Sequence, residues 1–145
     1  MNKNGFTLVE LLATIFILAI VIIIAYPVYT SVSKSVRESN LETTKVMLIN
    51  AMLDYGNKYL VDEIKPSGNT CSNNNCCKYY PIDYLISYGI FQSNNNEILN
   101  PVTNKPLTGY IKLSYNTSKF VLEGQYEAND NNAGNCEVIE LWRKY

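Results

Sequence analysis

The sequence predicts an α+β protein in which a long N-terminal helix, half membrane-type and half amphipathic, packs against a small antiparallel sheet. Three patterns lead to this prediction. Residues 11–33 are predominantly apolar and contain no Asp, Glu, Lys or Arg. Apolar residues from Val32 to Tyr59 then recur mostly at steps of three, four or seven, which is the spacing of one helix face. The last third of the chain alternates apolar and polar residues between turn signals, as strands do.

The apolar run at 11–33 is a candidate membrane helix, because its 23 residues would form a helix roughly 35 Å long, enough to cross a bilayer. Lys3 precedes the run, which favours a single pass with a cytoplasmic N-terminus. Glu10 lies at the edge of the run with no basic residue within helical reach. Acids in membrane segments are rare and costly, so Glu10 is a candidate functional residue.

Simpler explanations of this stretch remain open. A secretory signal peptide has a shorter apolar core that ends in a small-residue cleavage site, whereas Ala25-Tyr26-Pro27 is a poor site of that kind. A plain signal anchor explains the length and the orientation but assigns no role to Glu10. Glu10 could also lie at the level of the lipid headgroups, where its charge costs less.

The residues around Glu10 resemble the class III signal sequence of type IV prepilins and pseudopilins, in the run Gly5-Phe6-Thr7-Leu8-Val9-Glu10. The resemblance implies that a membrane peptidase cleaves between Gly5 and Phe6 and methylates the new amine of Phe6. The expected partners are identical or related pilins, a prepilin peptidase, an assembly ATPase and a platform membrane protein. The cationic amine of Phe6 can neutralise Glu10 of a neighbouring subunit when the apolar helices pack side by side.

We therefore expect four segments along the chain. These are a cleaved leader at 1–5, a transmembrane and filament-core half of the long helix at 6–33, an amphipathic half at 34–65 and a pilin-like globular head at 66–145. Pro27 removes one helical hydrogen bond, which predicts either a static kink or a weak point that unwinds during assembly. The helix should end near Lys65, because Pro66 follows.

The head is expected to contain one short helix and three strands. Pro81 at its start and Gly89 after its end delimit the helix. Alternating residues at 110–115, a turn at 116–118 and a returning strand at 120–126 predict a hairpin. A third strand is expected at 138–142, and polar loops are expected at 69–75 and 92–109.

The head also carries the four cysteines, Cys71, Cys76, Cys77 and Cys136, which predict two disulfides if the head lies outside the membrane. Because adjacent cysteines rarely pair with each other, we expect a short bridge from Cys71 to Cys76 or Cys77. A long bridge then joins the remaining one to Cys136 and stabilises the fold by a few kcal/mol. Free thiols or a four-thiolate metal site are the alternatives, but the usual paired zinc spacing is lacking, so we expect no metal.

Composition argues against several classes of function. The sequence has no His, which excludes Ser-His-Asp and Cys-His catalysis, so we expect neither an enzyme nor a cofactor. The formal net charge is −1 without a polybasic tract, which gives no clear signal for nucleic-acid binding. Twelve tyrosines could form a binding surface, but tyrosine is also common in cores and strands, and we assign them to packing.

Two classes of function remain. The first is structural, a subunit that starts in the cytoplasmic membrane and is polymerised into an extracellular type IV pilus at the cell surface. A shorter pseudopilus for DNA uptake or secretion is a variant of this class. The second is a binding role, either as a minor or tip pilin in adhesion or as a monomeric anchored protein whose disulfide loop recognises a ligand.

Overall fold

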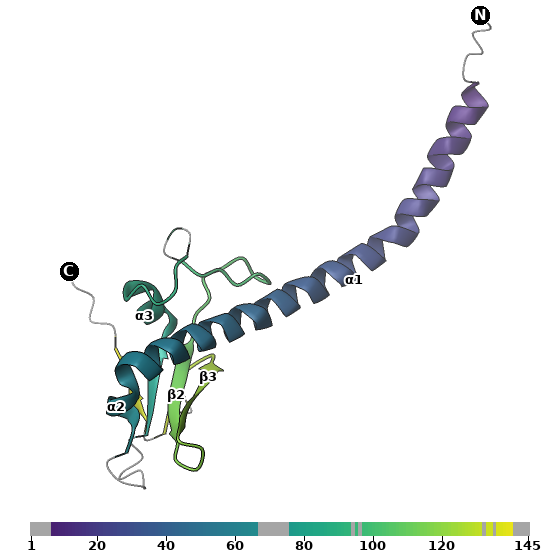
Figure 1. Cartoon of the computed structure of the whole chain (residues 1–145). Helices are drawn as coiled ribbons and strands as arrows, with labels where there is room; N and C mark the ends of the chain where they lie inside the picture. The colour runs from purple at the N-terminus through teal and green to yellow at the C-terminus, as the bar shows by residue number, and fades with distance from the viewer. Residues whose placement is uncertain are drawn as a thin grey trace, which may run out of the picture. The chain divides into compact units, whose positions relative to one another are not determined.

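The computed structural model describes residues 7–66, 76–93, 95, 97–131, 133–134 and 136–140. They form two compact units, divided between Ser39 and Asn40. The described part of the first unit consists mainly of helix α1 (Leu8–Tyr55), which continues without a break into the second unit (Figure 1). The second unit adds the sheet. The predicted α+β class is confirmed, because a long N-terminal helix packs against a small sheet.

Three helical segments follow one another directly. After α1 comes a π-helical turn, η1 (Gly56–Leu60), and then α2 (Val61–Ile64). Lys65 has extended backbone angles, with φ −64° and ψ 132°, so the helix ends where Pro66 was expected to stop it. The π turn was not predicted.

In the second unit, these segments present one face to the core. Leu48 and Met52 of α1 are fully buried, and Leu60 and Ile64 continue the buried face. The sequence pattern placed Tyr59 on this face, but its side chain is 57% exposed. A π turn holds more residues than an α turn, so η1 moves the buried position from Tyr59 to Leu60.

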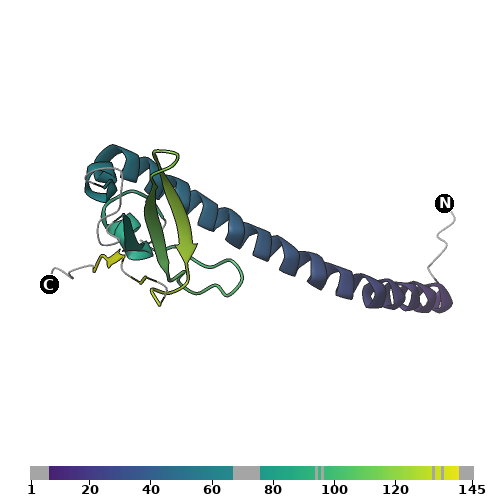
Figure 2. The same cartoon turned by 90° about the horizontal axis from the view of Figure 1, so that it is seen from below.

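The sheet has four strands in the order β3-β2-β1-β4. The strands are β1 (Cys77–Pro81), β2 (Tyr110–Asn116), β3 (Val121–Glu127) and β4 (Glu137–Val138). The pairs β1–β2 and β2–β3 are antiparallel, whereas β4 pairs with β1 in parallel. The sheet is therefore mixed: the expected antiparallel pairing holds for β1, β2 and β3, whereas β4 departs from it. Figure 2 shows the long strands β2 and β3 side by side, in green.

The hairpin of β2 and β3 and the short helix α3 (Ile82–Ser87) lie where they were predicted. Strand β1 was not predicted, because it is short, follows a polar loop directly and ends on Pro81. The third predicted strand, 138–142, corresponds to β4, which is shorter and starts one residue earlier. Leu141 and Trp142 of that prediction lie outside the described residues, as does the predicted loop 69–75.

The core lies between the helical segments and the sheet. Leu48, Met52 and Ile64 from the helices meet the fully buried Ile111 and Leu113 of β2. Burial of such side chains contributes about 1.5–3 kcal/mol each relative to exposure, so this face accounts for much of the stability of the second unit. The remaining buried members of the cluster are Leu60, Tyr80, Ile82, Tyr84, Leu85, Ile98, Leu107 and Leu122.

Candidate functional site

The start of α1 is closed by reciprocal hydrogen bonds between Thr7 and Glu10. The backbone N–H and the hydroxyl of Thr7 each donate to Glu10 Oε2, both at 3.0 Å. The backbone N–H of Glu10 donates to Thr7 Oγ1 at 3.3 Å. This pattern is a capping box, which satisfies N–H groups that have no partner within the helix.

Glu10 therefore has a neutral hydrogen-bond partner, Thr7, which was not expected from the sequence. Thr7 was not singled out from the sequence. The pattern T-x-x-E ahead of an apolar run indicates it, because this pattern places Thr7 at the N-cap of the helix. No described Lys or Arg forms a salt bridge with Glu10, so its charge has no cationic partner within the described part of the chain. Glu10 Oε1 accepts no hydrogen bond from the described residues and remains available to an outside donor. Gly5 and Phe6 lie outside the described residues.

The helix that follows this cap is exposed along its whole apolar part. Every described residue from Thr7 to Val32 is exposed, including large side chains such as Phe16 (64%) and Ile23 (72%). Among the described residues, only the helix Leu8–Ile64 is long and apolar enough to cross a membrane. Such a surface needs lipid or other apolar helices around it, because water does not solvate a continuous apolar face favourably.

Pro27 lies inside α1, and the helix continues through it without interruption. A proline cannot donate the hydrogen bond that would reach the carbonyl of Ile23, so the ladder lacks one bond here. Nearby, the hydroxyl of Thr30 donates to the carbonyl of Pro27 at 3.0 Å. Residues on one face around Pro27 line an apolar hollow of about 540 Å³: Val21, Ile24, Ala25, Val28, Tyr29 and Val32.

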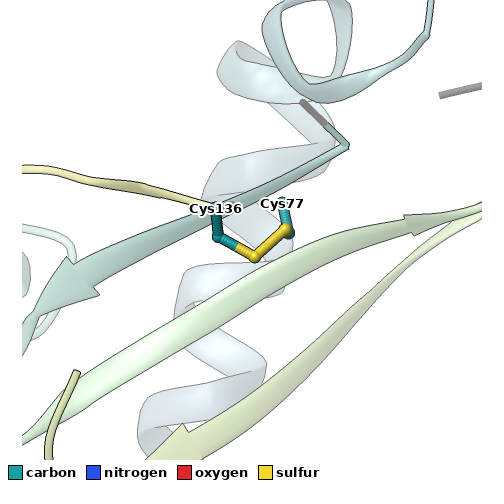
Figure 3. Close-up of a disulfide and its surroundings, with 2 residues drawn as sticks. All are labelled: Cys77 and Cys136. Carbon is teal, nitrogen blue, oxygen red and sulfur yellow. A yellow bond between two sulfur atoms is a disulfide. The ribbon is translucent and has the colours of Figure 1, made fainter. Parts of the chain in front are cut away.

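The head contains a disulfide between Cys77 and Cys136, 59 positions apart in the sequence (Figure 3). Their Cα atoms are 5.0 Å apart. Cys77 opens β1 and Cys136 immediately precedes β4, so the bridge lies one position ahead of the Lys78–Glu137 strand pair. Both strands leave the bridge in the same direction, which accounts for their parallel pairing.

This bridge resolves one of the alternatives left open by the sequence, because Cys77 rather than Cys76 bonds to Cys136. Cys76 is also disulfide-bonded. Cys71 lies outside the described residues, so the short bridge from Cys71 to Cys76 stays a prediction. No group of metal-ligating side chains with three or more members occurs within the described part of the chain.

An ion-pair cluster lies beside the bridge and connects three elements. Lys78 Nζ of β1 is 3.3 Å from a carboxylate oxygen of Glu63 in α2 and 3.3 Å from one of Glu137 in β4. The Lys78 side chain is only 15% exposed, which strengthens these interactions relative to those of a fully solvated pair. Together with the bridge, this cluster holds the two-residue strand β4 on the sheet edge.

Comparison with known proteins identifies the first part of the chain. Residues 1–26 match the family model of the prokaryotic N-terminal methylation motif. No curated protein and no solved structure matches the chain significantly. A single exposed apolar helix that leads into a small α+β head is the layout of a pilin-like protein.

The matched motif is the class III signal of type IV prepilins. The chain therefore carries the signal of a type IV pilin-like or pseudopilin-like precursor. The motif is that of structural pilin-type subunits, and it includes the first part of the apolar helix, which indicates membrane anchoring.

Proposed function

We propose that the chain is a structural subunit of a type IV pilus-like filament. The observation that carries the proposal is that the methylation motif at 1–26 continues into a helix whose apolar side chains are exposed from Leu8 to Val32. A protein that is only anchored in the membrane would need a long apolar helix but not the methylation motif. A filament subunit uses both features: the motif for processing and the apolar helix for packing against neighbouring subunits.

Processing is proposed to occur on the cytoplasmic side of the membrane. A prepilin peptidase cleaves after Gly5 and methylates the amine of Phe6, which removes the leader that contains Lys3. The leader is short and polar, and Gly5 offers a backbone without a side chain at the cut. The new amine then lies next to the Thr7–Glu10 cap.

Assembly is proposed to use the remaining charge of Glu10. Its Oε2 atom is occupied by Thr7, whereas Oε1 is open to a donor from outside the described chain. The amine of Phe6 from a neighbouring subunit supplies a cationic donor. A carboxylate that is costly in an apolar surrounding is thereby neutralised only when two subunits meet in one axial stagger.

The head is proposed to face the outside of the filament at the cell surface. A covalently bridged head is suited to an oxidising exterior, where disulfides persist. The assembly ATPase and the platform membrane protein are the expected machinery for extraction from the membrane. A shorter pseudopilus would be assembled from the subunit in the same way, and the length of the filament distinguishes a pilus from a pseudopilus.

The proposal is tested by intact-mass measurement under non-reducing conditions, on material sheared from cells and on the residual membranes. We expect the sheared fraction to contain a chain without residues 1–5, with one added methyl group and with the hydrogens of two disulfides missing. One of these bridges is Cys77–Cys136. An unprocessed chain found solely in membranes would instead indicate a plain anchored protein, and the filament proposal would be withdrawn.

A further inference from the structure

The head contains a groove of about 1280 Å³ that the proposed assembly does not use. Its walls come from α2, β1, α3 and β2, and from β4 with the chain on either side of it, so they all belong to the second unit. Pockets for small ligands usually measure about 300–1000 Å³, so this groove is large enough for an extended segment of polypeptide. We call it the acidic tyrosine groove, after the side chains that line it.

Three tyrosines of the lining, Tyr80, Tyr84 and Tyr88, form a ladder of rings. The ring centroids of Tyr80 and Tyr84 are 5.0 Å apart, and those of Tyr84 and Tyr88 are 4.2 Å apart with nearly parallel planes. Tyr80 and Tyr84 are buried, whereas Tyr88 is 59% exposed. The ladder therefore ends in an open ring, on which a planar cation such as a guanidinium group can stack.

The hydroxyl of Tyr80 is a polar group that the fold leaves unused. Tyr80 is only 2% exposed, yet its hydroxyl forms no hydrogen bond with the described residues. No described side-chain oxygen or nitrogen lacks both a partner and access to the surface, so this hydroxyl opens into the groove that Tyr80 lines. Burial raises the pKa of Tyr80, and the neighbouring Tyr84 and Glu63 raise it further, so the hydroxyl stays protonated. A buried donor without an acceptor points to a ligand that brings one.

The charged part of the lining is entirely acidic. The described residues that line the groove include no Lys or Arg, whereas they include four carboxylates, those of Glu63, Asp83, Asp130 and Glu140. Lys78 forms a salt bridge with Glu63, but no described residue does so with the other three carboxylates. Carboxylates around a concave surface concentrate negative potential, so the groove favours an occupant with positive charge.

We propose that the acidic tyrosine groove binds an extended, arginine-bearing segment of another protein. A guanidinium group suits both parts of the lining, because it stacks on aromatic rings and forms paired hydrogen bonds with carboxylates. The backbone carbonyls of the segment supply an acceptor for the Tyr80 hydroxyl. A neutral glycan would leave the carboxylates without a cation, and a single small cation would leave most of the groove empty.

Isothermal titration calorimetry tests the proposal on the full chain in a neutral detergent. The probes are three acetylated and amidated peptides, Arg-Tyr-Arg, Arg-Gly-Tyr-Arg and Arg-Gly-Tyr-Gly-Arg, which differ in the spacing of their arginines. We expect at least one of them to bind, and its counterpart with citrulline, a neutral analogue of arginine, to bind about tenfold more weakly or less. Raising the salt concentration from about 0.05 M to about 0.3 M should also weaken binding.

A first variant tests the charges of the lining. Asp83→Asn/Asp130→Asn should raise the Kd of the arginine peptide about tenfold, because two carboxylates lose their charge. Its control is Asp62→Asn/Glu97→Gln, which changes the same number of charges at exposed positions outside the groove lining and should bind like the unmodified chain. Thermal unfolding verifies that each variant is folded.

Two further variants test the tyrosines. Tyr80→Phe removes a hydroxyl that bonds to no described residue, so it should leave the stability of the head unchanged while raising the Kd about threefold or more. Its control is Tyr59→Phe, which removes a hydroxyl outside the groove lining and should not alter the Kd. Tyr88→Ala removes the open ring at an exposed position and should also weaken binding.

Several results would overturn the proposal. They are binding by none of the three peptides at about 1 mM, equal binding of the arginine and citrulline peptides, or an unchanged Kd in the folded groove variants. N-acetyl-arginine amide that binds as tightly as the peptides would assign the groove to a small cation. Sedimentation in which the peptide dissociates a dimer would assign it to a second copy of this chain. None of these readouts depends on filament formation, so failure here leaves the proposed function untouched.

Discussion

Gly124 of β3 lies so close to Ile49 of α1 that a Cβ atom at Gly124 would be 2.8 Å from Ile49 Cγ2. The same atom would be 3.1 Å from Leu53 Cγ. Ile49 Cγ2 is bonded to its own Cβ, and an isoleucine in a helix has essentially one favourable χ1 angle. The methyl group therefore cannot swing away cheaply, and the absence of a side chain at position 124 sets how closely the helix and the sheet approach.

The first prediction is that Gly124→Ala destabilises the head. Overpacking costs about 1–3 kcal/mol, while the loss of chain entropy in the unfolded state returns only about 0.4–1 kcal/mol. We expect a net loss of about 1–2 kcal/mol in the free energy of unfolding. Chemical denaturation in detergent measures it, with Gln125→Ala, at the exposed next position of β3, as the control.

A double variant tests the cause of this effect. Ile49→Ala removes Cγ2, so Gly124→Ala should cost clearly less in that background than in the unmodified chain. Equal costs in both backgrounds would mean that the close approach of Gly124 to Ile49 is not what limits the packing here.

The second prediction concerns the long disulfide. Replacing both partners, Cys77→Ser/Cys136→Ser, opens a loop of 59 positions and should lower the free energy of unfolding by about 4 kcal/mol in the chain-entropy description. Strand β4 should be affected first, because it has two residues and depends on the bridge, the Lys78–Glu137 ion pair and a few backbone bonds. Hydrogen exchange should show lost protection at Ile139, whose N–H donates to the Tyr79 carbonyl at 2.9 Å.

Protection in β2 and β3 serves as the internal control for this variant. These strands share seven register pairs and neither contains a bridged cysteine, so their amides should remain protected under native conditions. An unchanged exchange rate at Ile139 would show that β4 is held without the disulfide.

The elements that the sequence predicted correctly are those determined by local signals. Helical spacing identified the long helix, Pro81 and Gly89 delimited α3, and alternation with a polar turn identified the β2–β3 hairpin. The predictions were wrong where the local structure depends on contacts between residues that are far apart in the sequence. The parallel direction of β4 follows from a bond between Cys77 and Cys136, which the spacing of cysteines along the chain does not specify.

The phase shift at η1 has a similar origin. Gly56 packs its backbone against the sheet, since a Cβ there would be 2.8 Å from Leu113 Cδ1, and the helical pattern alone does not contain this contact. At the candidate site, Glu10 could be predicted as a functional residue because it is an acid at the edge of the apolar run. Thr7 could also be predicted from the T-x-x-E pattern, because a threonine three positions ahead of a glutamate is the signature of a capping box.

The third prediction concerns the pH dependence of the β2–β3 turn. Asn116 Nδ2 donates to Glu123 Oε1 at 2.8 Å and Lys119 Nζ donates to the same atom at 3.1 Å. These hydrogen bonds, that of Asn116 first, lower the pKa of Glu123 below its ordinary value of 4.5. A lowered pKa means that this contribution to stability is present above about pH 4.5 and is lost as the pH falls through the pKa of the folded state.

Carbon-detected NMR titration of the Glu123 carboxyl group measures this pKa directly. The variant Lys119→Met removes one donor and should raise the pKa of Glu123 towards its ordinary value while leaving Asn116 in place. A Glu123 that titrates at or above 4.5 in the unmodified chain would contradict the geometry described for this turn.

The fourth prediction separates the two roles of Glu10, as a helix cap and as a charge. Gln can replace Glu in a capping box, so Glu10→Gln keeps the hydrogen bonds to Thr7 and removes the charge. Thr7→Val keeps the charge and the branched shape but removes the hydroxyl, which both donates and accepts in the cap. If assembly uses the charge, Glu10→Gln should abolish incorporation into sheared filaments while Thr7→Val is still incorporated.

The controls for this pair are chosen to isolate assembly from processing. Glu38→Gln changes the same charge at an exposed position of α1 beyond the apolar run and should be incorporated normally. The intact mass of each variant in the membrane fraction shows whether residues 1–5 are lost, and therefore whether the peptidase still cleaves that variant. If Glu10→Gln assembles normally and Thr7→Val does not, Glu10 acts only through the cap, and the charge-pairing account of subunit stagger is wrong.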